Sequence, residues 1–548
     1  MALRRVLKDV VAGAIHGLVS VPDGLASGLL AGVNPVSGLY GYLVGTAAGA
    51  IATSSVFMSV QGTGAMAVII ADVDVLHSGS DPAGALATLG ILTGVIMLAL
   101  GLLRLGSLVR FVPNAVLVGF INAVAINIIL GQFSAFTGYT SAAANRLFRA
   151  VETIFHPQSF SWPTVLIGVL TIALIVLLER TPLGALSLFA AVVAASALCL
   201  LPFFDSVELL NDIAVIPPGL PMPVLPALDV IGVLLIPALS LAFVGLVQGA
   251  AISQSIPNPD GNFPDVSGDF RGQGIANIAS GFLRGTPVGG SMSATAVVLA
   301  AGARSRLANL TAAVVMAIVI LLFSGLAGYI AMPALAALLM LVGARMFKPR
   351  AILTVLRTGP TQAVITLVTF TLTLVIPLQY AVLIGVGLSI ILFVASQANR
   401  VKVVRWSFGG GALPTEETPP AVLPAGEIVV LNIYGSLFFA SAAALVEQLP
   451  TVPADAGPAV VIVRLRGKDD LGSTIIQALL RYRAEVRAAG GHLLLAGVGP
   501  SLLDQLEKSR ALGEIGSANV FIATRRVGES LENALDRARE LQDENYVG

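Results

Sequence analysis

Almost no charge interrupts the first part of the chain. Between Gly13 and Ala71 the only charged residue is Asp23. A helix needs about twenty apolar residues to cross a bilayer, so this stretch predicts two spans, about Val10 to Ala31 and Val36 to Ala52. Soluble proteins carry about 25% charged residues, whereas charged residues make up 11% of these 548. Most of the chain is therefore expected to lie among membrane lipids.

A third segment, Ser59 to Ala71, is too short to cross a bilayer and begins with flexible polar residues. Gly285 to Ala300 repeats this pattern far downstream, with glycines and hydroxyls before a similar apolar run. Two short, glycine-interrupted segments in corresponding halves are typical of transporter sites built from half-helices. Each helix start carries unpaired N–H donors and about half a positive charge, so two starts can hold a small anion without a basic side chain.

The same segment also fits a rival pattern. Gly62 to Ala67 matches the G-x-G-x-x-A pattern of dinucleotide-binding loops, and Asp81 lies roughly where a ribose-binding acid would be. That pattern requires a preceding strand in a soluble βαβ unit. Here membrane-like, Gly-rich and Ala-rich sequence precedes it, so no cofactor is expected.

Further apolar runs bring the expected spans to about fourteen, seven on each side of the polar stretch Ser206 to Pro226. The remaining spans of the first half are expected at about 86–103, 113–132, 165–178 and 183–201. Those of the second half are expected at about 230–256, 275–283, 285–300, 307–330, 333–346, 363–376 and 380–395.

A second echo supports two repeats, because Val112 to Leu117 resembles Met332 to Ala337. Chance similarity of Ala-, Val- and Leu-rich helices is the alternative. An odd number of spans in each half requires the second repeat to be inverted. The predicted transmembrane domain covers residues 1–400, with repeats at about 8–203 and 228–397.

Basic residues flank the first and last spans: Arg4, Arg5, Lys8, Arg400, Lys402 and Arg405. Positive residues favour the cytoplasmic side, so both termini are predicted to be cytoplasmic, which an even number of spans allows. The first apolar run exceeds signal-peptide length and lacks a cleavage site, which indicates a retained span. The single cysteine, Cys199, cannot form a disulfide framework. A net charge of zero argues against a nucleic-acid partner.

The last part of the chain has a different pattern of hydrophobic and polar residues. Residues 401–425, rich in Gly and Pro, are predicted to be a linker, and residues 426–548 a small α/β domain. Buried strands are expected at 428–431, 459–463 and 492–496, and helices at 441–448, 474–488, 502–509 and 529–543. The domain carries no phosphate-binding loop and no metal-ligand cluster in its sequence, so neither an enzyme nor a metal site is expected.

Several phrases, in order, resemble the SulP family of anion transporters. These are VPDGLASGLLAGVNPVSGLYG, the start at Gln61 to Gly64, GQGIANIASGF, GGSMSATAV with GARSRLANL, and NIYGSLFFASA. The resemblance covers nearly the whole chain. It implies a polytopic α-helical protein of seven-plus-seven inverted repeats, whose core and gate domains move relative to each other. It also implies a cytoplasmic STAS domain (sulfate transporter and anti-sigma factor antagonist) and usually a homodimer. Family members carry sulfate, bicarbonate, chloride or small dicarboxylates.

By this resemblance, the substrate lies at the starts of the third and tenth segments. The residues implied are Gln61, Gly62, Thr63, Gly64, Ala65, Gly289, Gly290, Ser291, Met292, Ser293, Ala294 and Thr295. Ala294 stands where an arginine is frequent, which leaves the anion to helix ends and hydroxyls and mildly favours a monovalent anion over sulfate. Gln248 stands where the eighth span usually has an acid. The sodium-binding role of that acid therefore does not carry over to this glutamine.

Asp23 stands where the family usually has a glutamine. An acid at membrane depth costs about 2.5–3.5 kcal/mol, so it is seldom without a role. We expect Asp23 to couple transport to a proton or sodium ion, with His16, two turns earlier on the same helix face, as a candidate relay. The alternatives are that Asp23 caps an interrupted helix or bonds a neighbour during uncoupled exchange, and that His16 is a packed polar residue.

The sequence is thus interpreted as a secondary active transporter of small inorganic anions in a cell (inner) membrane, embedded in lipid as a homodimer. Bicarbonate and sulfate are the leading substrates. A nucleobase permease would share the membrane fold but lack the STAS tail. A protein of another class, a membrane-anchored sensor acting through its STAS domain, would show no anion flux.

Overall fold

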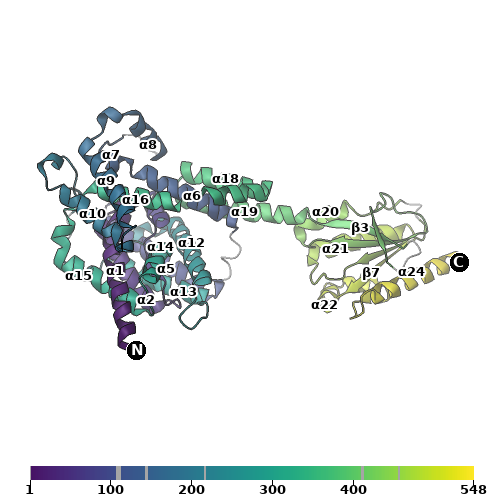
Figure 1. Ribbon diagram of the computed structural model, residues 1–548. Coiled ribbons are helices and arrows are strands. Elements are labelled where there is room, and N and C mark those ends of the chain that lie inside the picture. The colour runs from purple at the N-terminus through teal and green to yellow at the C-terminus, as the bar shows by residue number, and fades with distance from the viewer. Residues whose placement is uncertain are drawn as a thin grey trace. The chain divides into compact units, whose positions relative to one another are not determined.

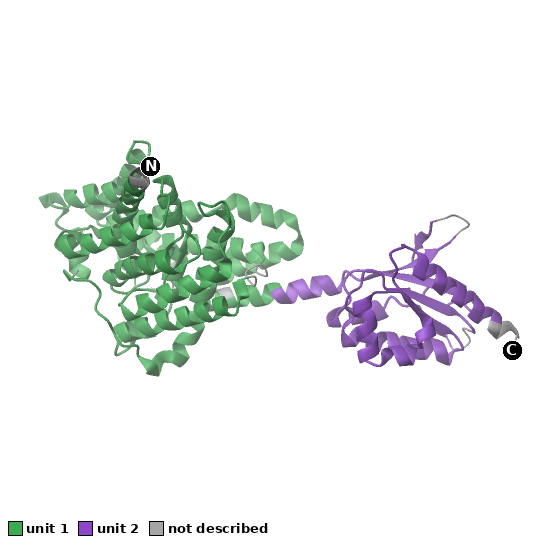
Figure 2. Ribbon diagram, turned by 90° about the horizontal axis from the view of Figure 1, so that it is seen from below, with its two compact units in different colours: residues 1–389 green, residues 390–548 purple. Residues whose placement is uncertain are grey.

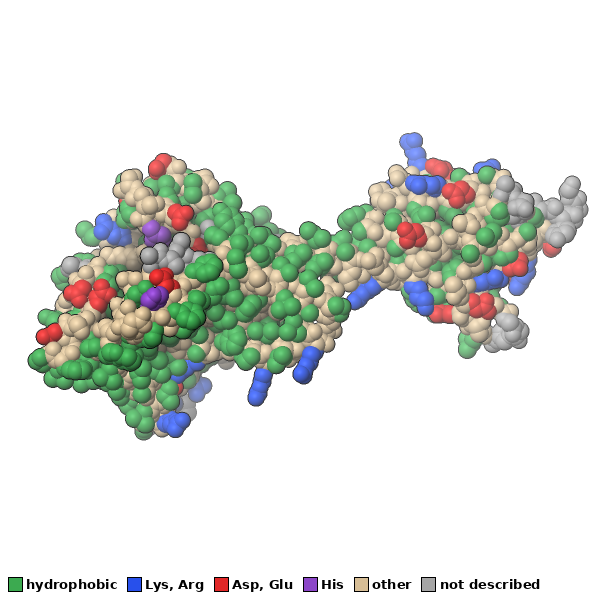
Figure 3. Space-filling model, turned by 90° about the horizontal axis from the view of Figure 1, so that it is seen from above, with side chains coloured by type: hydrophobic (Ala, Val, Ile, Leu, Met, Phe, Trp, Pro, Cys, Tyr) green, Lys and Arg blue, Asp and Glu red, His purple; other side chains and the backbone are tan. Residues whose placement is uncertain are grey.

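The computed structural model describes residues 2–106, 113–141, 146–214, 217–408, 413–453 and 457–547. These residues form two compact units, 1–389 and 390–548 (Figure 2). The first unit consists almost entirely of helices, and the second is an α/β domain. Large hydrophobic side chains such as those of Leu322 and Leu326 are exposed on the first unit, whose surface is broadly hydrophobic (Figure 3). Such a surface suits contact with lipid.

The helices confirm the predicted order of segments. The first half contains α1 (Ala2–Leu30), α2 (Pro35–Ala52), α3 (Gly64–Ala71), α5 (Pro82–Leu102), α6 (Asn114–Gly131), α9 (Trp162–Leu178) and α10 (Ser187–Leu198). The second half contains α12 (Ile231–Ser255), α13 (Val266–Phe282), α14 (Met292–Ala300), α15 (Leu307–Ala327), α16 (Met332–Met346), α18 (Pro360–Val375) and α19 (Leu378–Ala398). Among the described residues, six helices are long and apolar enough to cross a membrane by length and composition alone.

The bounds expected from hydropathy were wrong for segments that have a polar face. The ninth segment, expected to be short at 275–283, is the 17-residue helix α13, whose first half carries polar side chains. Expected loops also contain the short helices α4 (Val75–Ser78), α8 (Arg146–Phe155), α11 (Leu210–Ile213) and α17 (Pro349–Thr358). Helices with polar residues on one side do not form the continuous apolar runs by which spans are recognised.

Two groups of helices, each drawing on both halves, build the first unit. In one, α1 packs against α2 and α15, while α13 packs against α5 and α2, and α12 against α5. In the other, α6 packs against α16 and α18, and α9 against α10 and α16 (Figure 1). Helices α1 and α2 cross closely because glycines lie at the crossing point. A Cβ on Gly38 would lie 2.2 Å from the Gly24 carbonyl oxygen. Small residues permit such backbone approach in membrane helices.

The second unit contains a six-stranded sheet of order β4-β3-β5-β6-β7-β8. Its strands are β3 (Lys402–Ser407), β4 (Thr415–Glu417), β5 (Ile428–Tyr434), β6 (Val460–Arg464), β7 (His492–Val498) and β8 (Val520–Ile522). Neighbours from β5 to β8 are parallel, whereas β3 is antiparallel to both β4 and β5. The helices that pack on it include α20 (Ala442–Val446), α21 (Gly472–Ala488), α22 (Pro500–Lys508), α23 (Ala511–Ile515) and α24 (Glu529–Val547). Separate hydrophobic clusters fill its two faces, and α24 covers one of them.

The expectation that residues 401–425 form a linker is corrected by the structure, because part of this segment belongs to the sheet. Its residues supply β3 and β4, and the side chains of Val403 and Val404 are buried. Basic residues on β3 made this segment resemble the flank of a membrane span, and its partner strand β5 begins more than twenty residues later. The pairing of β3 therefore depends on a contact that local composition does not display.

Candidate functional site

The two short segments that resemble each other meet in the structure. Strand β1 (Ser59–Gln61) precedes α3, strand β2 (Gly289–Ser291) precedes α14, and the two strands pair antiparallel. Ser59 lies opposite Ser291, and Gln61 lies opposite Gly289. Because the strands are antiparallel, α3 and α14 start at opposite ends of this pair and run away from it. The positive ends of both helices are thus directed at one small region of the fold.

Each of these two helices has a hydroxyl cap and unused donors. The Thr63 hydroxyl accepts from the Met66 N–H at 3.4 Å, and the Ser291 hydroxyl accepts from the Ala294 N–H at 3.3 Å. The N–H groups of Gly64, Ala65 and Ser293 find no acceptor within the described part of the chain. Free backbone donors at the starts of helices are the groups that bind anions.

The remaining expected residues of the second segment differ in accessibility. Met292 and Ser293 are exposed, whereas Ala294 and Thr295 are buried. The Ser293 hydroxyl lies 3.2 Å from that of Ser291. The Thr295 hydroxyl donates to the Ser291 carbonyl at 2.6 Å and accepts from the Ser59 N–H at 3.1 Å. Thr295 therefore holds the two strands together, and Ser293 presents the more accessible hydroxyl.

Helix α12 packs directly against the backbone of β2. A Cβ on Gly290 would lie 2.6 Å from the Gly249 Cα, and one on Gly289 would lie 2.8 Å from the Gly245 Cα. These glycines serve the close contact between helix and strand. Gln248, one residue before this contact, is half-buried, and its Oε1 has no partner among the described residues.

A polar stripe on α13 satisfies the extended backbone that leads into α14. Gln273 Oε1 accepts from the Gly290 N–H at 3.0 Å. Asn277 bonds both the N–H and the carbonyl of Val288, at 2.8 and 2.6 Å. Non-helical backbone at membrane depth needs such partners because water is absent. These residues were not expected from the sequence, although polar side chains four apart in an otherwise apolar segment were a visible signal.

The Gln61 side chain points into a buried polar network on α1 and α2. Its Nε2 lies 3.0 Å from the hydroxyls of Ser20 and Thr46 and 3.3 Å from His16 Nε2. His16 Nε2 is in turn 2.9 Å from the Ser59 hydroxyl. His16 and Gln61 are each 1% exposed. Two residues singled out separately in the sequence thus belong to one network, which fixes β1 on α1.

Asp23 reaches the same region through a tyrosine, Tyr42, that was not among the expected site residues. The Tyr42 hydroxyl lies 2.9 Å from Asp23 Oδ2 and 2.9 Å from the Gly62 carbonyl oxygen. A tyrosine hydroxyl carries one hydrogen, so it cannot donate to both oxygens at once. If Asp23 is protonated, its own O–H can donate to Tyr42, which then donates to Gly62. Both contacts are satisfied together only in that state.

Another acid, Asp269 on α13, is buried and fully committed to structural bonds. Its carboxylate accepts from the hydroxyls of Ser54, Ser55 and Ser253 and from the Ser55 N–H, at 2.6 to 2.8 Å. These bonds join α13 to the end of α2 and to α12. Within the described residues, no group of three or more His, Cys, Asp or Glu side chains could hold a metal ion.

Two halves whose interrupted segments meet inside the helical unit define a membrane transport protein. Residues 6–369 match the model of the sulfate permease family, and residues 420–529 match the STAS domain. The chain therefore belongs to the sulfate permease family, and it is an anion transporter rather than an enzyme.

Known proteins resemble the chain over most of its length. It is 29% identical over 528 residues to the probable sulfate transporter MT1781 of Mycobacterium tuberculosis, covering 94% of this chain and 93% of that protein. It is 24% identical to the bicarbonate transporter BicA of Synechocystis, with the same shares covered. The inward-facing structure of murine Slc26a9, an anion transporter, has a TM-score of 0.84 at 17% identity, covering 97% of this chain and 91% of that one.

Proposed function

We propose that the protein is a secondary active transporter that carries bicarbonate or sulfate across the cell (inner) membrane. The pairing of β1 with β2 carries this proposal, because it directs the starts of α3 and α14 at one region. The anion binds there, to free N–H groups of Gly64, Ala65 and Ser293 and to the hydroxyls of Thr63 and Ser293. Gln61, Gly62 and the β2 glycines Gly289 and Gly290 form the adjoining backbone that shapes the site.

The chemistry of this region favours a monovalent anion. The segments 61–65 and 289–295 contain no basic side chain, so binding relies on backbone donors, hydroxyls and helix dipoles. The starts of the two helices together carry about one positive charge, which balances a monovalent anion better than a divalent anion. Bicarbonate is therefore our first choice and sulfate our second, and one relative is named for each anion.

We further propose that Asp23 couples transport to a proton. Protonation of Asp23 releases the Tyr42 hydroxyl to bond the Gly62 carbonyl, next to the start of α3. Ionisation draws the single Tyr42 hydrogen to the carboxylate and leaves that carbonyl without its donor. The bond to Gly62 thereby transmits the state of Asp23 to the anion site. A sodium ion on Asp23 is the second possibility, and His16 steadies Gln61 rather than relaying protons.

The two helix groups suggest how the anion moves. The site lies mainly on the group around α1, α5, α12 and α13, which would slide as a core past the group around α6 and α16 in an elevator-type cycle. Both termini are cytoplasmic in this proposal, and the transporter is a homodimer. The transmembrane domain covers about residues 1–400. The STAS domain includes β3 and so begins near Lys402, earlier than the 426 expected from sequence.

The direct test is uptake of radiolabelled bicarbonate and sulfate into proteoliposomes, with and without proton and sodium gradients. Saturable bicarbonate uptake driven by a proton gradient is expected. Flux that requires an anion on the far side and ignores both gradients would make the protein an exchanger. An absence of flux for every anion would refute the transport proposal.

The coupling proposal is tested with Asp23→Asn and Tyr42→Phe, compared with Asp260→Asn in an exposed loop. We expect both of these variants to lose the pH dependence of uptake, because each breaks the Asp23–Tyr42–Gly62 connection. The loop variant should behave like the wild type. Unchanged pH and sodium dependence in Asp23→Asn would show that this acid has only a structural role.

A further inference from the structure

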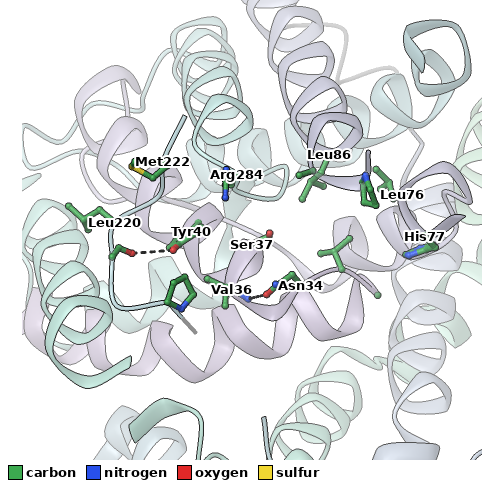
Figure 4. A pocket seen from close by; sticks show the side chains of 16 residues that line it. Asn34, Val36, Ser37, Tyr40, Leu76, His77, Leu86, Leu220, Met222 and Arg284 are labelled. Carbon is green, nitrogen blue, oxygen red and sulfur yellow. Dashed lines mark hydrogen bonds between the residues drawn. The ribbon is translucent and has the colours of Figure 1, made fainter. Parts of the chain in front are cut away.

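A separate cavity of about 650 Å³ lies at the end of α1 that is remote from the N-terminus. It is bordered by the α1–α2 turn, α4, the start of α5, the segment 217–222 and Arg284 (Figure 4). None of its lining residues belongs to β1, β2, α3 or α14. Ligand pockets in proteins typically have volumes of about 300–1,000 Å³, so the cavity is large enough for a small organic molecule.

The charge of this cavity has one sign. Among the described residues that line it, Arg284 is the only arginine or lysine, His77 adds an imidazole, and none is Asp or Glu. Within the described residues, the Arg284 side chain forms neither a hydrogen bond nor an ion pair. An arginine guanidinium matches a carboxylate with two parallel hydrogen bonds. The cavity is therefore suited to an anion.

The backbone at Arg284 is left-handed, as it is at one other arginine of the helical unit. Arg284 follows the end of α13 with φ of 59°, a left-handed conformation that glycine adopts without strain. Arg104, beyond the end of α5, has nearly the same conformation, φ 57°, but does not line the cavity. The conformation alone is thus no sign of a site, but Arg104 provides a matched control for Arg284.

The other walls are mostly apolar or already bonded. Val36, Leu86, Leu220 and Met222 supply hydrocarbon surface. The Asn34 side chain accepts from the Val36 N–H at 3.0 Å, and the Tyr40 hydroxyl donates to the Gly219 carbonyl at 3.1 Å. Among the described residues, an occupant would therefore meet one free cation, Arg284, and a largely hydrophobic wall. That combination fits a molecule with a single anionic group on a compact apolar body.

We propose that this cavity binds a small organic monocarboxylate, whose carboxylate pairs with Arg284 and whose apolar body lies against Leu86, Leu220 and Met222. The site is distinct from the proposed anion transport site. Only its sidedness rests on the proposed topology, which places it at the outer face because the N-terminus is cytoplasmic. Binding itself requires no flux, so it can be measured whether or not the transport proposal holds.

The test uses benzoate as probe and the full-length, detergent-purified protein, with saturation-transfer NMR as the readout. Wild-type protein should bind benzoate but not benzamide, its uncharged counterpart. Arg284→Gln should weaken benzoate binding at least about tenfold, and Arg104→Gln should leave it unchanged. Ala83→Phe places a phenyl group in the lining of the cavity while keeping Arg284, and it should weaken binding even if Arg284→Gln proves unstable.

Competition separates the two sites. Excess bicarbonate and sulfate should leave bound benzoate in place, and displacement would assign the benzoate to the transport site and overturn the proposal. Equal binding of benzamide, equal binding by Arg284→Gln, or an absence of wild-type binding would also overturn it.

Discussion

Replacing Gly290 with alanine tests whether the contact between β2 and α12 supports the transport site. The new Cβ would lie 2.6 Å from the Gly249 Cα and 3.1 Å from its nitrogen. Non-bonded carbons prefer a separation of about 3.5–4.0 Å, so the strand and helix must move apart by about 1 Å. Both contacting groups are backbone, and neither can rotate away. Overpacking of this kind costs about 1–3 kcal/mol.

The displacement should also impair transport. Gly290 donates its N–H to Gln273 at 3.0 Å and lies one residue before the cap of α14. Moving it by about 1 Å shifts the start of α14 relative to α3, and misplacement on that scale can cost about a hundredfold in site function. We expect uptake by Gly290→Ala to fall at least tenfold, with a lower midpoint of thermal unfolding.

Two further glycine variants make this prediction quantitative. A Cβ on Gly245 meets the terminal methyl of Met97 at 2.7 Å, and this flexible side chain can move, so Gly245→Ala should lose less activity. A Cβ on Gly325 in α15 meets nothing within 4 Å, so Gly325→Ala should match the wild type. Wild-type uptake and stability in Gly290→Ala would refute the argument that this contact positions the site.

Three other predictions concern the caps, the buried acid and the tail. Removing the hydroxyl caps by Thr63→Ala or Ser291→Ala should destabilise each helix start by about 0.5–2 kcal/mol and raise the anion concentration for half-maximal uptake; unchanged values would argue against binding at these starts. Asp269→Ala leaves several buried donors without an acceptor, and each unsatisfied donor costs about 1–3 kcal/mol of stability. The midpoint of thermal unfolding should therefore fall clearly, and an unchanged midpoint would contradict this account. A tail fragment of residues 400–547 should give cooperative unfolding by circular dichroism, whereas residues 420–547, without β3, should not; equal stability would make β3 dispensable.

The amino-acid sequence by itself determined the order and the approximate bounds of the apolar segments. It also determined three buried strands of the tail and the likeness of Ser59–Ala71 to Gly285–Ala300. These features are local, because hydrophobic length and periodicity are properties of neighbouring residues. For the same reason the segment starts at Gln61 and Gly289 were recognisable without any knowledge of their partners.

Only the tertiary structure decided how polar groups are satisfied. Tyr42 joins Asp23 to the Gly62 carbonyl, and the α13 stripe bonds the strand before α14. The partners in such bonds are distant in sequence. For example, Gly290 pairs with Val60 across more than two hundred residues. Buried backbone must find hydrogen bonds wherever the fold brings donors and acceptors together. Composition reveals that such groups exist, but three-dimensional packing selects their partners.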